Sequence, residues 1–285
     1  MPITVENLSY TYAPNTAYAA HALENISLTI TDGEFVGIMG KTGCGKSTLI
    51  QLLAGLLTPT GGSVWVDGEN IFAPNYDREK LRRTVGMVFQ YPEHQLFEMT
   101  VEKDVAFGLK HHAVTKEEKT ASVRQALEAV GFDYEAVKDL SPLSFSGGEK
   151  RRIAIAGVLA VKPKVLIMDE PIAGLDPLGR QAFLSLLDRL NAQGTTILMI
   201  SHNADAIAEH AKRVIVLEQG HVLLDGTTKE VLQQQILLRE HGLGSSQAAR
   251  IAELLTRKGI AMEEGTVRYE DLLRQLIAHG RGKRL

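Results

Sequence analysis

The stretch GKTGCGKST, Gly40 to Thr48, fits the glycine-rich phosphate-loop pattern at every fixed position. It follows the apolar run EFVGIMG and precedes LIQLLAG, which is the strand-then-helix context that the pattern needs. The glycines let backbone N–H groups converge on phosphates, Lys46 supplies a point charge near the β- and γ-phosphates, and the Ser47 hydroxyl can bind magnesium. The stretch therefore predicts an α/β protein of the P-loop NTPase class. The residues expected around the phosphates are Gly40, Lys41, Thr42, Gly43, Cys44, Gly45, Lys46, Ser47 and Thr48, with Cys44 as an inert, small filler.

Two apolar runs farther along the chain end in polar residues. KVLIMDE ends in Asp169 and Glu170, and adjacent carboxylates repel each other unless a cation lies beside them. A magnesium nucleotide supplies that cation, so Asp169 is predicted to bind the metal and Glu170 to act as general base toward the attacking water. TTILMISH ends in His202. Because His202 lies at a strand end, as Asp169 and Glu170 do, it is expected to contact the γ-phosphate. Without a phosphate loop, an ordinary strand end before a turn at Pro171 would be the better interpretation.

The remaining runs predict how the chain is organised. Short β-rich runs separated by turns indicate an antiparallel layer beside a buried parallel strand in the first third. Helix-like runs dominate residues 91–161 and are interpreted as a helical insert. The runs 164–170 and 195–202 are expected to be central parallel strands joined by crossover helices. Residues 213–226 predict a hairpin, and a capping box at Thr227 predicts a helix through about Arg239, followed by two or three short amphipathic helices.

The composition of the chain excludes some classes of protein. The chain has 285 residues, of which 44% are hydrophobic, enough for one large domain with a small appendage. Its formal net charge of -3 gives no basic field for nucleic acid, so no nucleic-acid partner is expected. No apolar run approaches the ~20 residues that cross a bilayer, and no signal peptide is expected. The single cysteine, Cys44, suits a reducing compartment, and His111 and His112 are expected to be solvated loop residues.

A second glycine-rich motif lies about a hundred residues after the phosphate loop. LSFSGGEKRRIAIAGVLA, which begins at Leu143, places Ser146, Gly147 and Gly148 directly before a helix-like run. One bound nucleotide has a single triphosphate, and one helix start with free N–H groups is normally enough to hold it. The nucleotide bound by the chain's own phosphate loop therefore does not explain why the second glycine-rich motif is present.

With these motifs in this order, the sequence resembles the nucleotide-binding subunit of an ATP-binding cassette (ABC) transporter from about residue 3 to residue 226. The resemblance implies ATP and Mg²⁺ as ligands. It further implies that Tyr12 stacks on adenine, that Gln90 senses magnesium and the attacking water, and that His202 is the switch histidine. Asp176 in AGLDP would make contacts across a dimer.

The same resemblance assigns a role to the second glycine-rich motif. In this family two subunits meet head to tail, and the signature motif of one completes the phosphate site of the other. Phe145 to Glu149 would be that motif, although Phe145 replaces the commonest leucine and Glu149 the commonest glutamine. The residues that would serve the partner's ATP are Ser146, Gly147, Gly148 and Glu149.

A narrower resemblance lies in the runs 89–108 and 145–180, together with a C-terminal extension of about fifty residues. These are similar to the paired ATPases of energy-coupling factor (ECF) transporters, which import vitamins or transition-metal ions, and more to the second ATPase of the pair. The resemblance implies a sister ATPase, a transmembrane scaffold subunit and a membrane substrate-binding subunit, at the cytoplasmic face of the cell membrane. Tyr91 to Met99 is expected to form a groove for a basic coupling helix, unless this loop packs its apolar residues inward.

These expectations give a domain division and leave two alternatives. Residues 1–226 are expected to form the ABC ATPase domain, with a helical subdomain at about 91–161, and residues 227–285 a helical extension used for dimerisation. One alternative is the ATPase of another ABC transporter class. The other is a soluble, non-transport ABC ATPase, which would need a long coiled-coil insert, zinc-ligand cysteines or a second cassette. A non-hydrolysing regulatory subunit would be expected to lack Glu170 or His202, and both are present.

Overall fold

The computed structural model describes residues 2–110 and 114–282, so His111 and His112 lie outside the described residues. Its centre is a six-stranded sheet of order β10-β9-β3-β8-β7-β6, in which every neighbouring pair except β10 and β9 is parallel. The strands are β3 (Phe35–Met39), β6 (Val85–Val88), β7 (Val165–Asp169), β8 (Thr196–Ile200), β9 (Arg213–Glu218) and β10 (His221–Thr227). The predicted central strands are β7 and β8, and the predicted hairpin is β9 with β10, so both predictions are confirmed.

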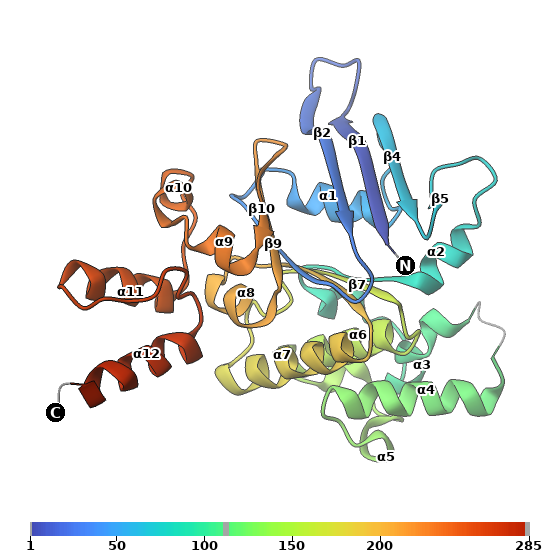
Figure 1. The fold of residues 1–285 in the computed structure, drawn as a ribbon. Coiled ribbons are helices and arrows are strands. Elements are labelled where there is room, and N and C mark those ends of the chain that lie inside the picture. Colours follow the sequence, from blue (N-terminus) through green and yellow to red (C-terminus); the bar gives the residue numbers. More distant parts are fainter. Residues whose placement is uncertain (1, 111–113, 283–285) are drawn as a thin grey trace.

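A second sheet is antiparallel and has the order β2-β1-β4-β5 (Figure 1). Its strands are β1 (Ile3–Tyr12), β2 (Ala20–Ile30), β4 (Gly61–Val66) and β5 (Glu69–Asn70). Apolar side chains from β1, β2 and β4 pack with helix α1 (Lys46–Leu53) and with one face of the central sheet in a single buried cluster. The predicted antiparallel layer beside a parallel strand is thus confirmed.

Strand β3 is buried on both faces because side chains alternate along a strand. Val36 and Ile38 belong to the cluster under the antiparallel sheet, whereas Phe35 and Met39 belong to the cluster formed with the helices. β3, β7 and β8 run in the same direction, so their carboxyl ends meet at one edge of the sheet. Ligands of open parallel sheets bind at that edge.

The described residues between β6 and β7 contain helices and no strand, as predicted for an insert at 91–161. Figure 1 shows these helices below the central sheet, on the side away from the antiparallel layer. Gly131 adopts a φ of +86° just beyond the end of α4 (Lys116–Ala129), a conformation that favours glycine after a helix. The elements are η1 (Pro92–Gln95), α3 (Val101–Val105), η2 (Phe107–Leu109), α4 (Lys116–Ala129), α5 (Tyr134–Val137), η3 (Pro142–Ser144) and α6 (Gly147–Leu159).

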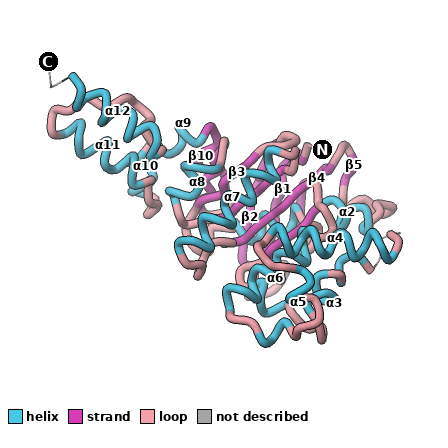
Figure 2. The backbone as a smooth tube through the Cα atoms, turned by 90° about the horizontal axis from the view of Figure 1, so that it is seen from below, coloured by secondary structure: helices cyan, strands magenta, loops and turns pink. Residues whose placement is uncertain are grey.

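The chain beyond β10 forms four helices within the described residues, and the last two project away from both sheets (Figures 1 and 2). The capping box at Thr227 and Glu230 is confirmed, but the single helix predicted through Arg239 is wrong. It breaks at Gln233 and Gln234, because three consecutive glutamines provide no apolar contact to hold a straight helix between the buried Leu232 and Leu238. The helices are α9 (Thr228–Leu232), α10 (Gln235–Glu240), α11 (Gln247–Arg257) and α12 (Tyr269–Gly282).

Candidate nucleotide site

The phosphate loop joins β3 to α1 through backbone conformations that need glycine. Gly45, at the N-cap of α1, has a φ of +106°, and a Cβ added there would lie 2.5 Å from the carbonyl oxygen of Ala22. Gly43 has a φ of +83°. Side chains strain a backbone in this region, which explains the glycine spacing of the motif. The loop leads into the N-terminus of α1, where free N–H groups and the positive end of the helix dipole favour an anion.

Lys46 is held by its own loop. Its ammonium donates hydrogen bonds to the carbonyl oxygens of Gly40, at 2.6 Å, and Lys41, at 2.7 Å. These two carbonyls use two of its three donors, and a longer contact of 3.9 Å joins the ammonium to Cys44 Sγ, which is a weak acceptor that a phosphate oxygen can replace. Cys44 is buried in the cluster under the antiparallel sheet, where a small side chain fits between β3 and α1.

Ser47 and Asp169 come together from different elements. The Ser47 hydroxyl donates a 2.8 Å hydrogen bond to Oδ2 of Asp169, across 122 residues of sequence. Gln90 lines the same cavity. A hydroxyl, a carboxylate and an amide oxygen are hard oxygen donors of the kind that Mg²⁺ takes beside nucleotide phosphates. The residues predicted to hold magnesium therefore fit that ion.

Glu170 and His202 lie at the adjoining ends of β7 and β8. His202 Nε2 is 3.6 Å from Glu170 Oε1, and that oxygen is buried without a hydrogen-bond partner. Burial raises the pKa of Glu170 to about 7, an effect that Asp169 reinforces and the His202 backbone amide, Lys46 and Arg151 oppose. Burial, with the nearby Lys46 charge, lowers the pKa of His202. A carboxylate with a pKa near neutrality is suited to accept a proton from water.

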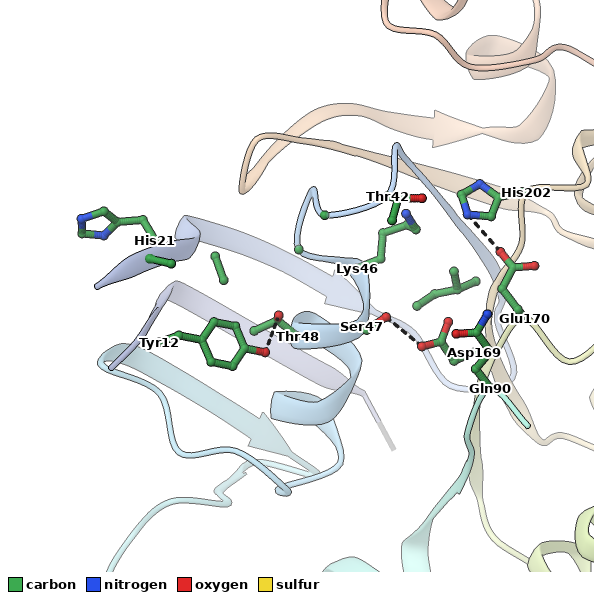
Figure 3. Close-up of a pocket in the computed structure, with 15 residues that line it drawn as sticks. Tyr12, His21, Thr42, Lys46, Ser47, Thr48, Gln90, Asp169, Glu170 and His202 are labelled. Atoms are coloured by element: carbon green, nitrogen blue, oxygen red, sulfur yellow. Dashed lines mark hydrogen bonds and ion pairs between the residues drawn. The ribbon is translucent and has the colours of Figure 1, made fainter. Parts of the chain in front are cut away.

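These side chains surround one cavity of about 350 Å³ (Figure 3). Tyr12 and His21 lie at one end, the catalytic candidates at the other, and Lys46 between them. The Tyr12 hydroxyl shares a 3.0 Å hydrogen bond with Thr48, and its exposed ring meets Tyr10 edge-on. The cavity is lined by Tyr12, Ala20, His21, Ala22, Thr42, Gly43, Gly45, Lys46, Ser47, Thr48, Gln90, Asp169, Glu170, Ile200 and His202.

Sequence reasoning missed the wall formed by Ala20, His21 and Ala22. Only strand pairing brings them there, because β1 pairs with β2 so that Tyr12 faces Ala20 and Thr11 faces His21. Three predicted loop residues, Gly40, Lys41 and Cys44, are not among the lining residues.

The other predicted site residues do not line the cavity and make local bonds instead. Ser146 caps α6 in a reciprocal capping box: the Ser146 N–H and hydroxyl both donate to Glu149 Oε2, at 2.9 Å and 2.7 Å. These hydrogen bonds lower the pKa of Glu149. Asp176 caps α7 (Pro177–Ala192) by accepting a 2.6 Å hydrogen bond from the Gly179 N–H. Ser146, Gly147, Gly148 and Asp176 are all exposed, so a second chain could reach them.

Residues 23–173 match the family model described as ABC transporter. The chain belongs to the ABC transporter ATPases. Within this family it is 47% identical to the energy-coupling factor transporter ATP-binding protein EcfA2 of Clostridium perfringens, over 93% of each chain. It is also 47% identical to the EcfA2 of Symbiobacterium thermophilum, over 95% of this chain and 94% of that one. These relatives place it among the ECF-type ABC ATPases, as the motifs indicated.

Solved structures of ABC ATPases share the fold. One is cbiO1 from Clostridium perfringens, described as part of the ABC transporter complex cbiONQ, with a TM-score of 0.72 and 38% identity over 89% of this chain and 98% of that one. Another is the dimeric post-hydrolysis state of the ATP-binding cassette MJ0796 with ADP and Pi, with a TM-score of 0.70 and 29% identity over 79% of this chain and 98% of that one. The P-loop ABC ATPase fold is thus confirmed. Within residues 2–110 and 114–282, no helix is both long and apolar enough to cross a membrane.

Proposed function

We propose that this ABC ATPase is the energy-coupling subunit of an ECF-type importer, at the cytoplasmic face of the cell membrane. ATP hydrolysis at the cavity would drive the uptake of vitamins or transition-metal ions through a membrane scaffold and a substrate-binding membrane subunit. The observation that carries the hydrolytic part is the buried Glu170 carboxylate, unpartnered at Oε1 and 3.6 Å from His202. Both residues face the cavity that the phosphate loop enters.

The roles in hydrolysis follow from position. Glu170 accepts the proton of the attacking water, and His202 contacts the γ-phosphate and orients Glu170. Lys46 and the loop N–H groups bind the β- and γ-phosphates, while Tyr12 stacks on adenine at the far end of the cavity. Ser47, Asp169 and Gln90 would hold Mg²⁺, which neutralises phosphate charge when bound.

We assign the signature residues to a sister ATPase. Ser146, Gly147, Gly148 and Glu149 are absent from the chain's own cavity, yet they form an exposed helix N-terminus suited to a phosphate. Asp176 would contact the same sister across the dimer. The solved neighbour with ADP and Pi is described as dimeric, which supports this arrangement.

The segment Tyr91 to Met99 supports a contact with the membrane scaffold. Phe97 is 61% exposed and Met99 77%, whereas Leu96 is buried. The alternative, a loop that turns its apolar residues inward, therefore fits only Pro92 and Leu96. The Phe97 ring meets the half-exposed ring of Phe107 edge-on at 4.9 Å, so the exposed apolar surface continues beyond the loop. Adjacent exposed apolar side chains of this kind mark a protein contact.

The C-terminal extension is proposed to contact the sister ATPase. α11 and α12 pack against each other through Ala248, Ala252 and Leu272. The Gln247 N–H donates to Asp205, and the Tyr269 N–H to Glu209, so both helices are attached to α8 (Ala204–His210), which follows His202. Five aliphatic side chains of these two helices are exposed and available for a partner, namely Ile251, Leu254, Leu273, Leu276 and Ile277.

Purification of the native membrane complex through this chain tests the proposal. We expect a second ABC ATPase, a large membrane subunit and a small hydrophobic subunit whose bound solute identifies the cargo. ATPase activity should be weak in the isolated chain and rise in the complex. Recovery with a conventional two-domain permease, or with no membrane protein, would favour the alternative ABC classes. Among the described residues, the longest helix between β6 and β7 is α4, with 14 residues, which disfavours a soluble ABC protein with a coiled-coil insert.

A further inference from the structure

Arg151 lies on α6, five residues after Ser146, and is almost completely buried, with 4% of its surface exposed. Its guanidinium reaches the turn that follows β7. One terminal nitrogen donates to the Glu170 carbonyl oxygen at 2.7 Å and the other to the Ala173 carbonyl oxygen at 2.6 Å. Burying an arginine costs free energy unless its N–H groups are hydrogen-bonded. The two bonds to backbone carbonyls therefore offset part of the cost of burying this guanidinium.

The turn that Arg151 holds has an unusual backbone. Glu170 adopts a φ of +48°, in the left-handed region that residues with a side chain rarely adopt. Such a conformation persists only where the surroundings fix it. On its N-terminal side, the Glu170 N–H donates to the Ile200 carbonyl oxygen at 3.0 Å. On its C-terminal side, the Glu170 carbonyl oxygen accepts from the Ala173 N–H and from Arg151.

Arg151 also interacts electrostatically with charged groups of the η1 segment and of the Glu170 turn. Burial lowers the pKa of the guanidinium, and the charge of Glu93 opposes that effect most strongly, ahead of Tyr91 and Glu170. Oε2 of Glu93 and Nε of Arg151 are both buried without a hydrogen-bond partner. The cation therefore lies among the η1 segment, the signature helix and the Glu170 turn.

We propose that Arg151 is a positioning residue for Glu170: it fixes the left-handed turn that aims the carboxylate into the cavity. This inference rests on the proposed role of Glu170 as general base. Arg151 touches the Glu170 main chain and does not line the cavity, so it acts on the reaction only through Glu170. Because Ser146 and Arg151 are about 7.5 Å apart along one helix axis, a movement of α6 at Ser146 would reach Glu170 through this contact.

Arg151→Gln in the full-length chain, assembled with its sister ATPase, tests the inference. We expect kcat to fall about 10- to 100-fold while the Kd for ATP changes less than about twofold, because the general base is misplaced and the phosphate loop is intact. Arg151→Lys can restore one of the two hydrogen bonds and should recover part of kcat. The matched control is Arg152→Gln on the same helix. Arg152 also donates to a backbone carbonyl, that of Val130 at 3.1 Å, and its guanidinium lies over Phe132, away from the Glu170 turn.

A double variant separates positioning from a general structural role. Glu170→Gln should accumulate an ATP-bound closed dimer, and Arg151→Gln added to it should leave that amount unchanged, because Arg151 acts only on a group already disabled. A loss of trapped dimer in the double variant, or an equal fall of kcat per folded protein in Arg152→Gln, would overturn the inference. If Arg151→Gln does not fold, Arg151→Lys supplies the same kcat-against-Kd comparison. Should Glu170→Gln itself hydrolyse ATP normally, the proposed function fails; unchanged kcat in Arg151→Gln with an inactive Glu170→Gln rejects only this inference.

Discussion

His202 Nε2 lies 3.6 Å from Glu170 Oε1 across the adjoining ends of β8 and β7. The two residues are 32 positions apart in sequence, and parallel pairing of Asp169 with Ile200 brings them together. Glu170 is mostly buried, whereas the imidazole is about half exposed. The carboxylate is thus fixed by the fold, and the histidine can adjust to a ligand that enters the cavity.

Glu170→Gln is expected to retain ATP binding and lose hydrolysis. An amide has nearly the shape of the carboxylate but does not take the proton of the attacking water, while Lys46 and Ser47 remain in place. We expect kcat to fall at least about 10²-fold. Single-turnover hydrolysis and equilibrium ATP binding, measured on the same assembled complex, check this. Near-normal turnover would mean that another group is the base.

His202→Ala is expected to lower kcat with a smaller effect on ATP affinity, because the γ-phosphate contact and the partner of Glu170 are both lost. The control is His210→Ala. His210 Nδ1 binds Asp188 at 2.9 Å, ten residues beyond the end of β8, so its removal should leave turnover within about twofold. An equal loss of kcat in His202→Ala and His210→Ala would show that His202 has no specific role in hydrolysis.

Gly45→Ala is expected to abolish ATP binding. An added Cβ would lie 2.5 Å from the Ala22 carbonyl oxygen, at a φ of +106° that alanine adopts only under strain. Gly43→Ala is the matched control, since its φ is +83° but no heavy atom lies within 4 Å of an added Cβ. Isothermal titration with ATP should therefore show a much larger loss for Gly45→Ala. Equal affinities in the two variants would show that the loop relaxes around Ala22.

The phosphate loop and the strand ends were predictable because they are local: each depends on residues adjacent in sequence. The cavity wall at His21 was not, because it depends on the register between β1 and β2. The break at Gln234 was also missed, since a capping box predicts where a helix begins and not how far tertiary contacts let it continue. The bond from Arg151 to the Glu170 carbonyl joins a side chain to a backbone 19 residues away, for which no sequence pattern exists.

The double substitution Phe97→Ser and Met99→Ser is expected to uncouple ATP hydrolysis from transport, because it removes exposed apolar surface from the proposed scaffold contact. Charge reversal at Glu93 and Glu98 is a poorer test, since the charge of Glu93 acts on the buried Arg151 and Glu98 pairs with Lys110 at 3.4 Å. Leu56→Ser removes an apolar side chain that is 55% exposed, just beyond α1 and outside the proposed contacts, and serves as control. Solute uptake and ATPase activity in proteoliposomes provide the comparison. Normal uptake by the double variant would place the coupling contact elsewhere.

Ser146→Arg is expected to damage the sister's nucleotide site while sparing the chain's own. Ser146 lies at the exposed N-terminus of α6 and does not line this chain's cavity, whereas Lys46 does. A bulky cation at Ser146 would displace the hydroxyl and obstruct the N–H groups meant for the sister's γ-phosphate, so electrostatic stabilisation is lost at that site. Lys46→Ala should weaken nucleotide binding in this chain first.

The substitution also removes a helix cap, which costs about 1 kcal/mol, and that cost needs its own control. Thr115→Arg removes the equivalent cap of α4, where Thr115 and Glu118 form the same reciprocal box and do not line the nucleotide cavity. A photoreactive ATP analogue should then label both subunits in the Thr115→Arg complex. In the Ser146→Arg complex it should label this chain nearly normally, with nucleotide trapping reduced in the sister. The opposite pattern, with this chain unlabelled and trapping in the sister preserved, would show that Ser146 serves its own nucleotide.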